Sequence, residues 1–304
     1  MIKNSCLRWL AVIAAMLLLL VPMAYGQDAA ELTEAQTPDV PDTLSGWDMG
    51  WEAGLNVSQA AYSNWSTGGV NSYNLNSFSR IRIMYQKDRF AYDFQVRTRY
   101  GQARVQEEGR RKTDDRIRIR NRFLYDLSQE DSEFKLFGNL NFETQFTEGF
   151  DYGGGDEGQD VLISDFFSPA YFNQIVGLAY FPEDEFSVDA GLGLRQTVIR
   201  DTTLSERYGL DPGQQFRLES GVALGVNFET EIMEDIDYTV SIESFTNVFR
   251  PMRDTYVAFG NQLTGRVNDY VNVQFQLDIV HDPDFSRRLQ LAQSFSAGVT
   301  VNIY

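Results

Sequence analysis

Residues 47–57, Trp-Asp-Met-Gly-Trp-Glu-Ala-Gly-Leu-Asn-Val, alternate in character at every position. The odd positions are apolar, and the even positions are polar, charged or glycine. Such alternation predicts a β-strand with one apolar face and one hydrated face. The pattern recurs to the end of the chain, in segments longer than the roughly five or six residues of an average strand. They approach or exceed the roughly ten residues that a tilted strand needs to cross a bilayer. The sequence therefore predicts an all-β fold, a transmembrane antiparallel up-and-down β-barrel.

The N-terminus has the features of a secretory signal peptide. Lys3 and Arg8 form a positive region before an apolar run over residues 10–21, and small residues surround a cleavage point after Gly26. The apolar run is too short for a transmembrane helix, which needs about twenty residues. We predict a cleavable signal peptide over residues 1–26, a disordered periplasmic lead-in over 27–45 and an outer-membrane β-barrel over 46–304.

Charge and cysteine content exclude several functions. The net charge is −17, and removal of the signal takes away two bases and no acids. So acidic an exported chain is a poor candidate for nucleic-acid binding. The only cysteine, Cys6, lies within the predicted signal. The mature chain then has no disulfide, thiolate metal site or cysteine nucleophile.

The alternating segments number about twelve. The predicted strands are 47–62, 70–86, 89–104, 114–127, 133–146, 171–181, 185–200, 216–232, 235–248, 255–266, 270–280 and 288–303. Short polar connections alternate along the chain with longer ones, the longer being 63–69, 105–113, 147–170, 201–215, 249–254 and 281–287. Short periplasmic turns and longer outer loops are typical of bacterial outer-membrane barrels with an even number of strands. We therefore predict the outer membrane of a Gram-negative bacterium, with membrane lipid as one partner.

The last nine residues, Ser-Ala-Gly-Val-Thr-Val-Asn-Ile-Tyr, resemble the C-terminal signature of chains that the barrel-assembly machinery recognises. That machinery is therefore a predicted partner. In lipid, an unpaired strand edge leaves backbone groups unsatisfied at several kcal/mol each. We therefore expect the last strand to pair with the first.

Arginines gather on the polar face of three neighbouring predicted strands. They are Arg80 and Arg82, then Arg97 and Arg99, then Arg116, Arg118, Arg120 and Arg122. A cation that faces the bilayer midplane costs about 2–4 kcal/mol, so this face must line the lumen. The inward-phase acids lie largely on other strands, at Glu143, Asp189, Glu219, Glu229, Asp237, Glu243 and Asp278.

Two interpretations of these charges remain open. In the first, Arg97, Arg99, Arg116, Arg118, Arg120 and Arg122 line a water-filled pore and attract anionic or zwitterionic solutes. In the second, arginines and acids interlock across a narrow lumen and fill it.

Catalysis has little support in the sequence, and we predict a protein that is not an enzyme. The sole histidine, His281, is followed by Asp282 and Pro283 in a predicted outer loop. A histidine–carboxylate pair can serve a hydrolase, but no Gly-x-Ser-x-Gly elbow accompanies it. The same residues are ordinary turn formers.

The longest predicted connection is acidic and rich in glycine. Asp151, Asp156, Glu157 and Asp160 stand there without a basic residue, and carboxylates in such a stretch can wrap a cation such as calcium. Their spacing matches no known calcium loop, so a flexible surface loop is the alternative. The triple glycine lacks the lysine of a phosphate-binding loop, and no cofactor is predicted.

Segments in the outer loops resemble an uncharacterised family of outer-membrane-type proteins from Bacteroidota and their relatives, domain of unknown function 3078. The segments are 56–59, 64–69, 112–115, 144–146, 149–150, 163–166, 168–171 and 208–213. The resemblance implies a secreted barrel and supplies no activity or ligand. One of these segments contains Trp65, which is either an aromatic that contacts a ligand or a residue of the membrane-interface girdle.

The leading hypothesis is a passive channel or small-solute uptake protein of porin-like architecture that leans towards anionic solutes. The alternative is a plugged structural or adhesion barrel that binds a partner through its outer loops. An outer-membrane hydrolase is a third possibility.

Overall fold

The computed structural model describes Val40 and residues 44–60, 72–105, 109–128, 133–284 and 288–302. The predicted signal peptide and most of the predicted lead-in lie outside these residues. Among the described residues, no helix combines the length and apolar character required to cross a bilayer.

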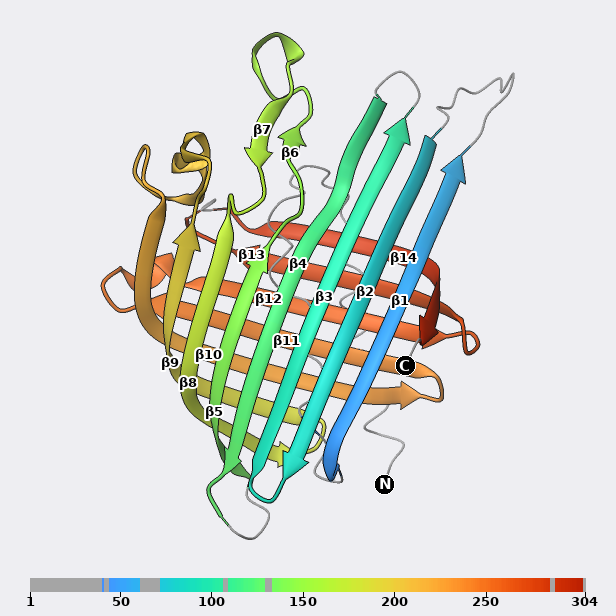
Figure 1. The fold of residues 1–304 in the computed structure, drawn as a ribbon, viewed down its shortest axis with the longest axis vertical. Coiled ribbons are helices and arrows are strands. Elements are labelled where there is room, and N and C mark those ends of the chain that lie inside the picture. The colour runs from blue at the N-terminus through green and yellow to red at the C-terminus, as the bar shows by residue number, and fades with distance from the viewer. Residues whose placement is uncertain are drawn as a thin grey trace.

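Twelve antiparallel strands close into one barrel (Figure 1), as predicted. The barrel strands are β1 (Gly46–Ala60), β2 (Ser72–Lys87), β3 (Phe90–Val105), β4 (Gly109–Asp126), β5 (Phe134–Thr144), β8 (Ala170–Glu183), β9 (Phe186–Val198), β10 (Phe216–Met233), β11 (Ile236–Asn247), β12 (Tyr256–Arg266), β13 (Val271–His281) and β14 (Gln290–Asn302). Each barrel strand pairs with the next one along the chain, the up-and-down topology. In Figure 1, β1 to β4 cross in front of β11 to β14 at a steep angle, so the strands are strongly tilted.

Pairing of β1 with β14 closes the barrel, as expected from the need to satisfy both strand edges in lipid. Among the described residues, four residue pairs form this seam, from Glu52 with Asn302 to Leu55 with Val299. The neighbouring β1–β2 ladder runs from Gly46 to Ala60 without interruption.

Two connections differ from the prediction. Residues 105–113 are not a long loop, because Val105 ends β3, pairs with Gly109 and leaves only 106–108 between the strands. The strict alternation of short and long connections is therefore wrong at this point. Residues 147–170 are not simply a flexible loop either, because β6 (Gly149–Asp151) pairs with β7 (Val161–Ser164) in a separate hairpin.

The remaining connections define the two ends of the barrel. Two-residue turns at 88–89, 184–185 and 234–235 mark one end, which we call the short-turn end. The β6–β7 hairpin and residues 199–215 mark the other, which we call the long-loop end. Short 3₁₀ helices lie in its connections, η2 (Asp156–Gly158), η3 (Thr202–Leu204), η4 (Glu206–Tyr208) and η5 (Met252–Asp254).

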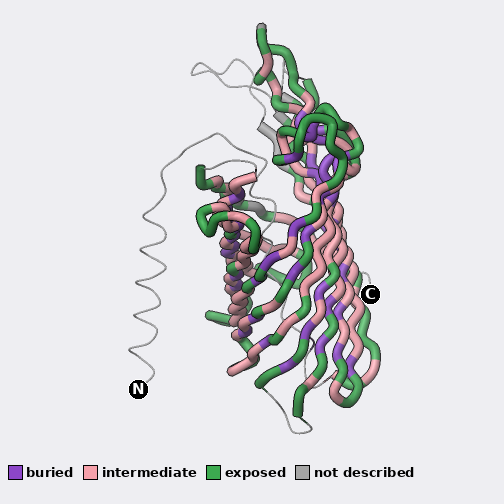
Figure 2. The backbone as a smooth tube through the Cα atoms, turned by 90° about the vertical axis from the view of Figure 1, so that its left-hand side faces the viewer, coloured by how far each residue is buried: buried purple, intermediate pink, exposed green. Residues whose placement is uncertain are grey.

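Buried and exposed residues alternate along the strands (Figure 2). Leu192 at the middle of β9 is 67% exposed on the outside, whereas Asp189 and Arg195, at odd-numbered positions of the same strand, are buried in the interior. Val176 and Leu224 are likewise exposed. An apolar outer belt around a polar interior is the arrangement of a barrel that spans a membrane.

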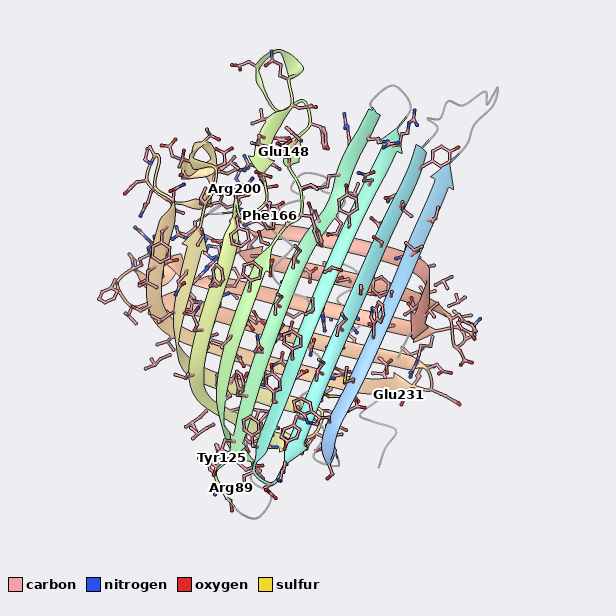
Figure 3. The ribbon with its side chains drawn as sticks, viewed as in Figure 1. Arg89, Tyr125, Glu148, Phe166, Arg200 and Glu231 are labelled. Atoms are coloured by element: carbon pink, nitrogen blue, oxygen red, sulfur yellow. The ribbon has the colours of Figure 1, made fainter. Side chains whose placement is uncertain are left out.

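Aromatic side chains gather near both ends of the strands. At the short-turn end the rings of Trp47 and Tyr85 pack at a tilt, with centroids 4.6 Å apart. The Arg89 guanidinium lies 4.7 Å from the Tyr125 ring centroid (Figure 3). At the long-loop end Arg200 lies 5.8 Å from the Phe166 ring centroid (Figure 3). Aromatic girdles at two levels are typical of membrane-spanning barrels.

Candidate functional site

The interior of the barrel carries arginines on three neighbouring strands. The strand registers place Arg80 of β2 opposite Arg97 of β3, and Arg97 opposite Arg118 of β4. Alternation turns them inward, while Ile81 and Ile119 between them face outward. The arginine wall, as we call this surface, consists of Arg80, Arg82, Arg97, Arg99, Arg116, Arg118, Arg120 and Arg122. A role of these residues in binding stays a prediction.

Several acids share the strands of the arginine wall, contrary to the expectation that they lie largely elsewhere. The Arg82 guanidinium binds both oxygens of Asp93, at 3.0 Å each. The Arg99 side chain reaches Asp114 at 2.6 Å. These acids face the same interior as the arginines because cross-strand neighbours on one face lie close together. The arginine wall is therefore less positive than its sequence suggests.

Other arginines bind acids beyond the arginine wall. Arg118 donates to Glu143 of β5 at 2.7 Å. Arg122 makes a bidentate contact with Asp189 of β9, at 2.8 and 3.0 Å, which passes two intervening strands. Asp189 and Arg122 are both buried. These contacts match the interlocked arrangement of the second interpretation, since they stiffen and narrow the lumen.

A cavity remains beside these ion pairs. It has a volume of about 130 Å³ and is lined by residues of β4, β5, β8, β9, β10, β11 and β12. Its charged lining includes Arg118 and Arg120 on one side and Glu243 on β11. The lumen thus combines fixed ion pairs with room for a small solute.

Arg195 at one side of this cavity was not singled out by the sequence. Its guanidinium lies 5.4 Å from the ring centroid of Tyr171 and 5.2 Å from that of Tyr256. Asp282 lies 3.9 Å away as its counter-ion. A single inward arginine on β9 gives no run to notice, and its aromatic partners come from β8 and β12, so only the closed barrel reveals the cluster.

Apolar side chains occupy the interior towards the short-turn end, where the sequence predicts polar groups. Ala91, Leu124, Phe137 and Ala179 point inward from four strands and form one buried cluster with Val40, which is 5% exposed. Val40 belongs to the predicted lead-in, and the sequence did not predict this contact. We call this cluster the apolar seal. Because apolar contact excludes water, the apolar seal keeps water out of this part of the interior.

Val40→Asp should raise the conductance of the refolded protein in planar bilayers several-fold. A carboxylate placed against Leu124 and Phe137 loses its hydration, so residue 40 should leave the apolar seal. Val161→Asp, in the β6–β7 hairpin, is the matched control, and we expect it to leave conductance unchanged. An unchanged conductance in the Val40 variant would show that the segment does not restrict the path.

A charge cluster ties the connections together at the long-loop end. Arg217 donates to Asp284 at 2.6 Å, and Arg250 from the β11–β12 connection binds the same carboxylate. The hydrogen bond to Asp284 raises the pKa of Arg250 above its ordinary value. Tyr208 of η4 donates to the Ile163 carbonyl of β7 at 2.8 Å. The long-loop end is therefore an organised surface held by contacts between connections.

The other predicted site residues are Trp65 and the four acidic residues of the connection between β5 and β8. Trp65 lies outside the described residues. In the acidic connection, Asp160 accepts a hydrogen bond from the Gly153 amide at 3.0 Å and so shapes the hairpin turn. Asp151, Asp156 and Glu157 belong to the same segment, and no group of three or more possible metal ligands occurs in the described part of the chain.

The geometry around His281 does not form a hydrolase site. Its Nδ1 lies 3.0 Å from the Thr255 carbonyl oxygen. Its sequence neighbour Asp282 pairs with Arg195 instead. Within the described residues no serine hydroxyl bonds to His281. The arrangement matches the structural interpretation, a histidine that anchors the end of β13.

Comparison with solved structures finds several β-barrels at low sequence identity. An outer-membrane channel from Pseudomonas putida F1 is 11% identical, with a TM-score of 0.44, over 90% of this chain and 99% of that one. The translocator domain of the autotransporter NalP from Neisseria meningitidis is 12% identical, with a TM-score of 0.43, over 85% and 89%. The KdgM porin is 10% identical, with a TM-score of 0.32, over 84% and 99%. Likeness at this level does not assign a function.

No curated protein sequence matches the chain. One family model matches residues 57–150, which run from β1 through the arginine wall to β6. This agrees with the family resemblance seen in the sequence. The matched family is described as a protein of unknown function (DUF3078).

Proposed function

We propose that the protein is a passive outer-membrane channel that admits small polar solutes and favours anions over cations. In this proposal residues 1–26 direct export and are cleaved, and the barrel-assembly machinery inserts the chain into the outer membrane of a Gram-negative bacterium. The observation that carries the proposal is a cavity with charged side chains in its lining, inside a barrel whose outside is apolar. Arg118 and Arg120 line that cavity and supply the positive charge.

Ion selectivity in planar bilayers tests the channel. We expect the refolded protein to conduct, with a chloride permeability above that of potassium, because fixed positive charge on a lumen wall raises the local anion concentration. Arg120→Gln should lower the chloride-to-potassium permeability ratio by about twofold or more, since it removes one charge from the lining. Arg253→Gln removes an arginine that is 75% exposed at the long-loop end, and it should leave the ratio unchanged.

The reversal potential across a salt gradient gives the ratio directly. A cation preference in the unmodified protein would contradict the anion-favouring proposal. If neither the unmodified protein nor the Val40→Asp variant conducts, the proposal of a channel is contradicted.

A plugged structural or adhesion barrel is the second candidate, and two observations favour it. The apolar seal occupies the interior near the short-turn end, and the Arg122–Asp189 contact crosses the interior. The organised long-loop end would then be the binding surface. This candidate predicts closed bilayers together with loss of partner binding when the β6–β7 hairpin is deleted.

A further inference from the structure

Arg195 is a buried cation whose hydrogen-bond donors find no acceptor in the described part of the chain. The residue is 8% exposed and lines the cavity. Its guanidinium packs against the rings of Tyr171 and Tyr256. Its ionic contact with Asp282 is 3.9 Å long, which is beyond hydrogen-bonding distance. Because buried donors are ordinarily satisfied, those of Arg195 are suited to a solute in the cavity.

The acids that line the same cavity are engaged by other groups of the protein. Glu143 accepts a hydrogen bond from Arg118 at 2.7 Å, and Asp189 accepts one from Arg122 at 2.8 Å. Glu243 has a partner as well. Carboxylates that are neutralised by arginines at short range oppose an entering anion less than isolated carboxylates would.

Two amide side chains continue from Arg195 in one row across the strands. Asn173 of β8 is directly opposite Arg195 in the register, and Asn141 of β5 is directly opposite Asn173. Both line the cavity, and neither amide has a hydrogen bond to another described residue. Side chains directly opposite each other on antiparallel strands are neighbours on one face. Asn173 therefore supplies a further donor beside the guanidinium.

Apolar surface lies next to Arg195 on the same inward face of β9. Gly193 is two residues before Arg195, and a Cβ atom there would lie 3.2 Å from the Phe245 ring and 3.3 Å from Ile175. Phe245 and Ile175 thus approach the strand over the glycine, and both line the cavity. The cavity volume of about 130 Å³ is close to the roughly 150 Å³ that accommodates benzene in a protein interior.

We infer that the cavity binds a small monocarboxylate with an apolar body the size of a benzene ring, its carboxylate on Arg195 and its ring against Phe245 and Ile175. Arginine binds a carboxylate through two parallel hydrogen bonds, and Asn173 donates a third. The rings of Tyr171 and Tyr256 already hold the guanidinium, so little side-chain freedom is lost on binding. This inference rests on the proposed channel and names the class of solute that the channel would favour.

Benzoate and three related compounds test the inference on the refolded full barrel. Benzamide has the shape of benzoate without its charge, acetate lacks the ring, and naphthoate has a second ring. Calorimetric titration in detergent, with detergent alone as the blank, should show benzoate binding at least about tenfold more tightly than benzamide, which lacks the charge-assisted contact. Acetate should bind more weakly than benzoate because it buries less apolar surface. Naphthoate should also bind more weakly, because it exceeds the cavity volume.

Variants of the Arg195 pair make the assignment specific. Arg195→Gln should abolish the preference for benzoate over benzamide. Asp282→Asn should tighten benzoate binding about twofold or more, because it removes a negative charge close to the site. Opposite effects of the two variants are not expected if Arg195 and Asp282 only stabilise the fold.

Arg200→Gln is the matched control. Arg200 also lies over an aromatic ring and pairs with an aspartate, but its side chain is 59% exposed at the long-loop end. It does not line the cavity, so the variant should bind benzoate as the unmodified protein does. Heat-dependent migration on gels confirms that each variant is folded.

Equal affinity for benzoate and benzamide, in a folded protein that conducts, would overturn the inference and leave the channel intact. A benzoate preference that survives in Arg195→Gln would overturn it as well. Benzoate binding that depends on Arg195 in a protein that does not conduct would overturn the channel and leave the cavity assignment standing, because calorimetry does not require an open path.

Discussion

Leu192→Arg is expected to destabilise the folded barrel in lipid by about 2–4 kcal/mol. Leu192 is the central residue of β9 and points outward, so the new guanidinium would face hydrocarbon near the middle of the strand. No acid on the outer belt is available to neutralise it, because the neighbours across the strands are Val176 and Val222. Urea titration of the protein folded into lipid vesicles measures the loss in the free energy of unfolding.

Val161→Arg is the matched control for that substitution. Val161 begins β7 in the hairpin outside the barrel, and it too is an exposed apolar residue of a strand. There the arginine stays hydrated, so we expect a change within about 0.5 kcal/mol. Equal effects at the two positions would show that the outside of the barrel does not contact lipid, and the membrane assignment would then fail.

Asp189→Asn is expected to cost about 3–5 kcal/mol of stability. The carboxylate receives two hydrogen bonds from the Arg122 guanidinium, and both residues are buried. Its removal takes away the carboxylate that accepts two hydrogen bonds from a buried cation, so the desolvation of that cation is less well compensated. The double variant Arg122→Met/Asp189→Leu removes both charges and should recover most of the loss.

An exposed ion pair provides the comparison. Arg266 and Asp237 approach to 3.7 Å at the short-turn end, and the arginine side chain is 53% exposed. Asp237→Asn should therefore change stability by less than about 1 kcal/mol. A double-mutant cycle on Arg122 and Asp189 isolates their coupling. A coupling no larger than that of the exposed pair would mean that water reaches the Arg122–Asp189 contact and that the lumen is wider than it appears.

The strands and their orientation could be predicted from the sequence because alternation is a local property. An apolar side chain at every second residue places Trp47, Leu192 and Leu224 on the outside, whichever strands they pair with. The same alternation places Arg97 and Arg118 inside. Resemblance to the family of unknown function is likewise carried by short segments, and the family model matches residues 57–150.

The local sequence pattern was insufficient to predict the strands where the chain leaves the membrane. Beyond the bilayer a strand pair needs no apolar face, so residues 105–113 showed no alternation, although β3 extends to Val105 and β4 begins at Gly109. Contacts from elsewhere hold this hairpin in place, since the Lys112 amide donates to the Tyr152 hydroxyl at 2.9 Å. Such contacts depend on the β6–β7 hairpin, forty residues away in sequence.

The sequence by itself determined that this chain forms a closed barrel of about twelve strands with arginines inside. Only the tertiary structure decided which charges meet, because strand tilt and closure bring together residues from distant strands, such as Arg122 and Asp189. The position of Val40 inside the barrel was also decided there, since a single apolar residue in an acidic segment has no periodicity to reveal it. Inward orientation follows from the pleat of each strand, whereas pairing across the lumen follows from the shape of the whole barrel.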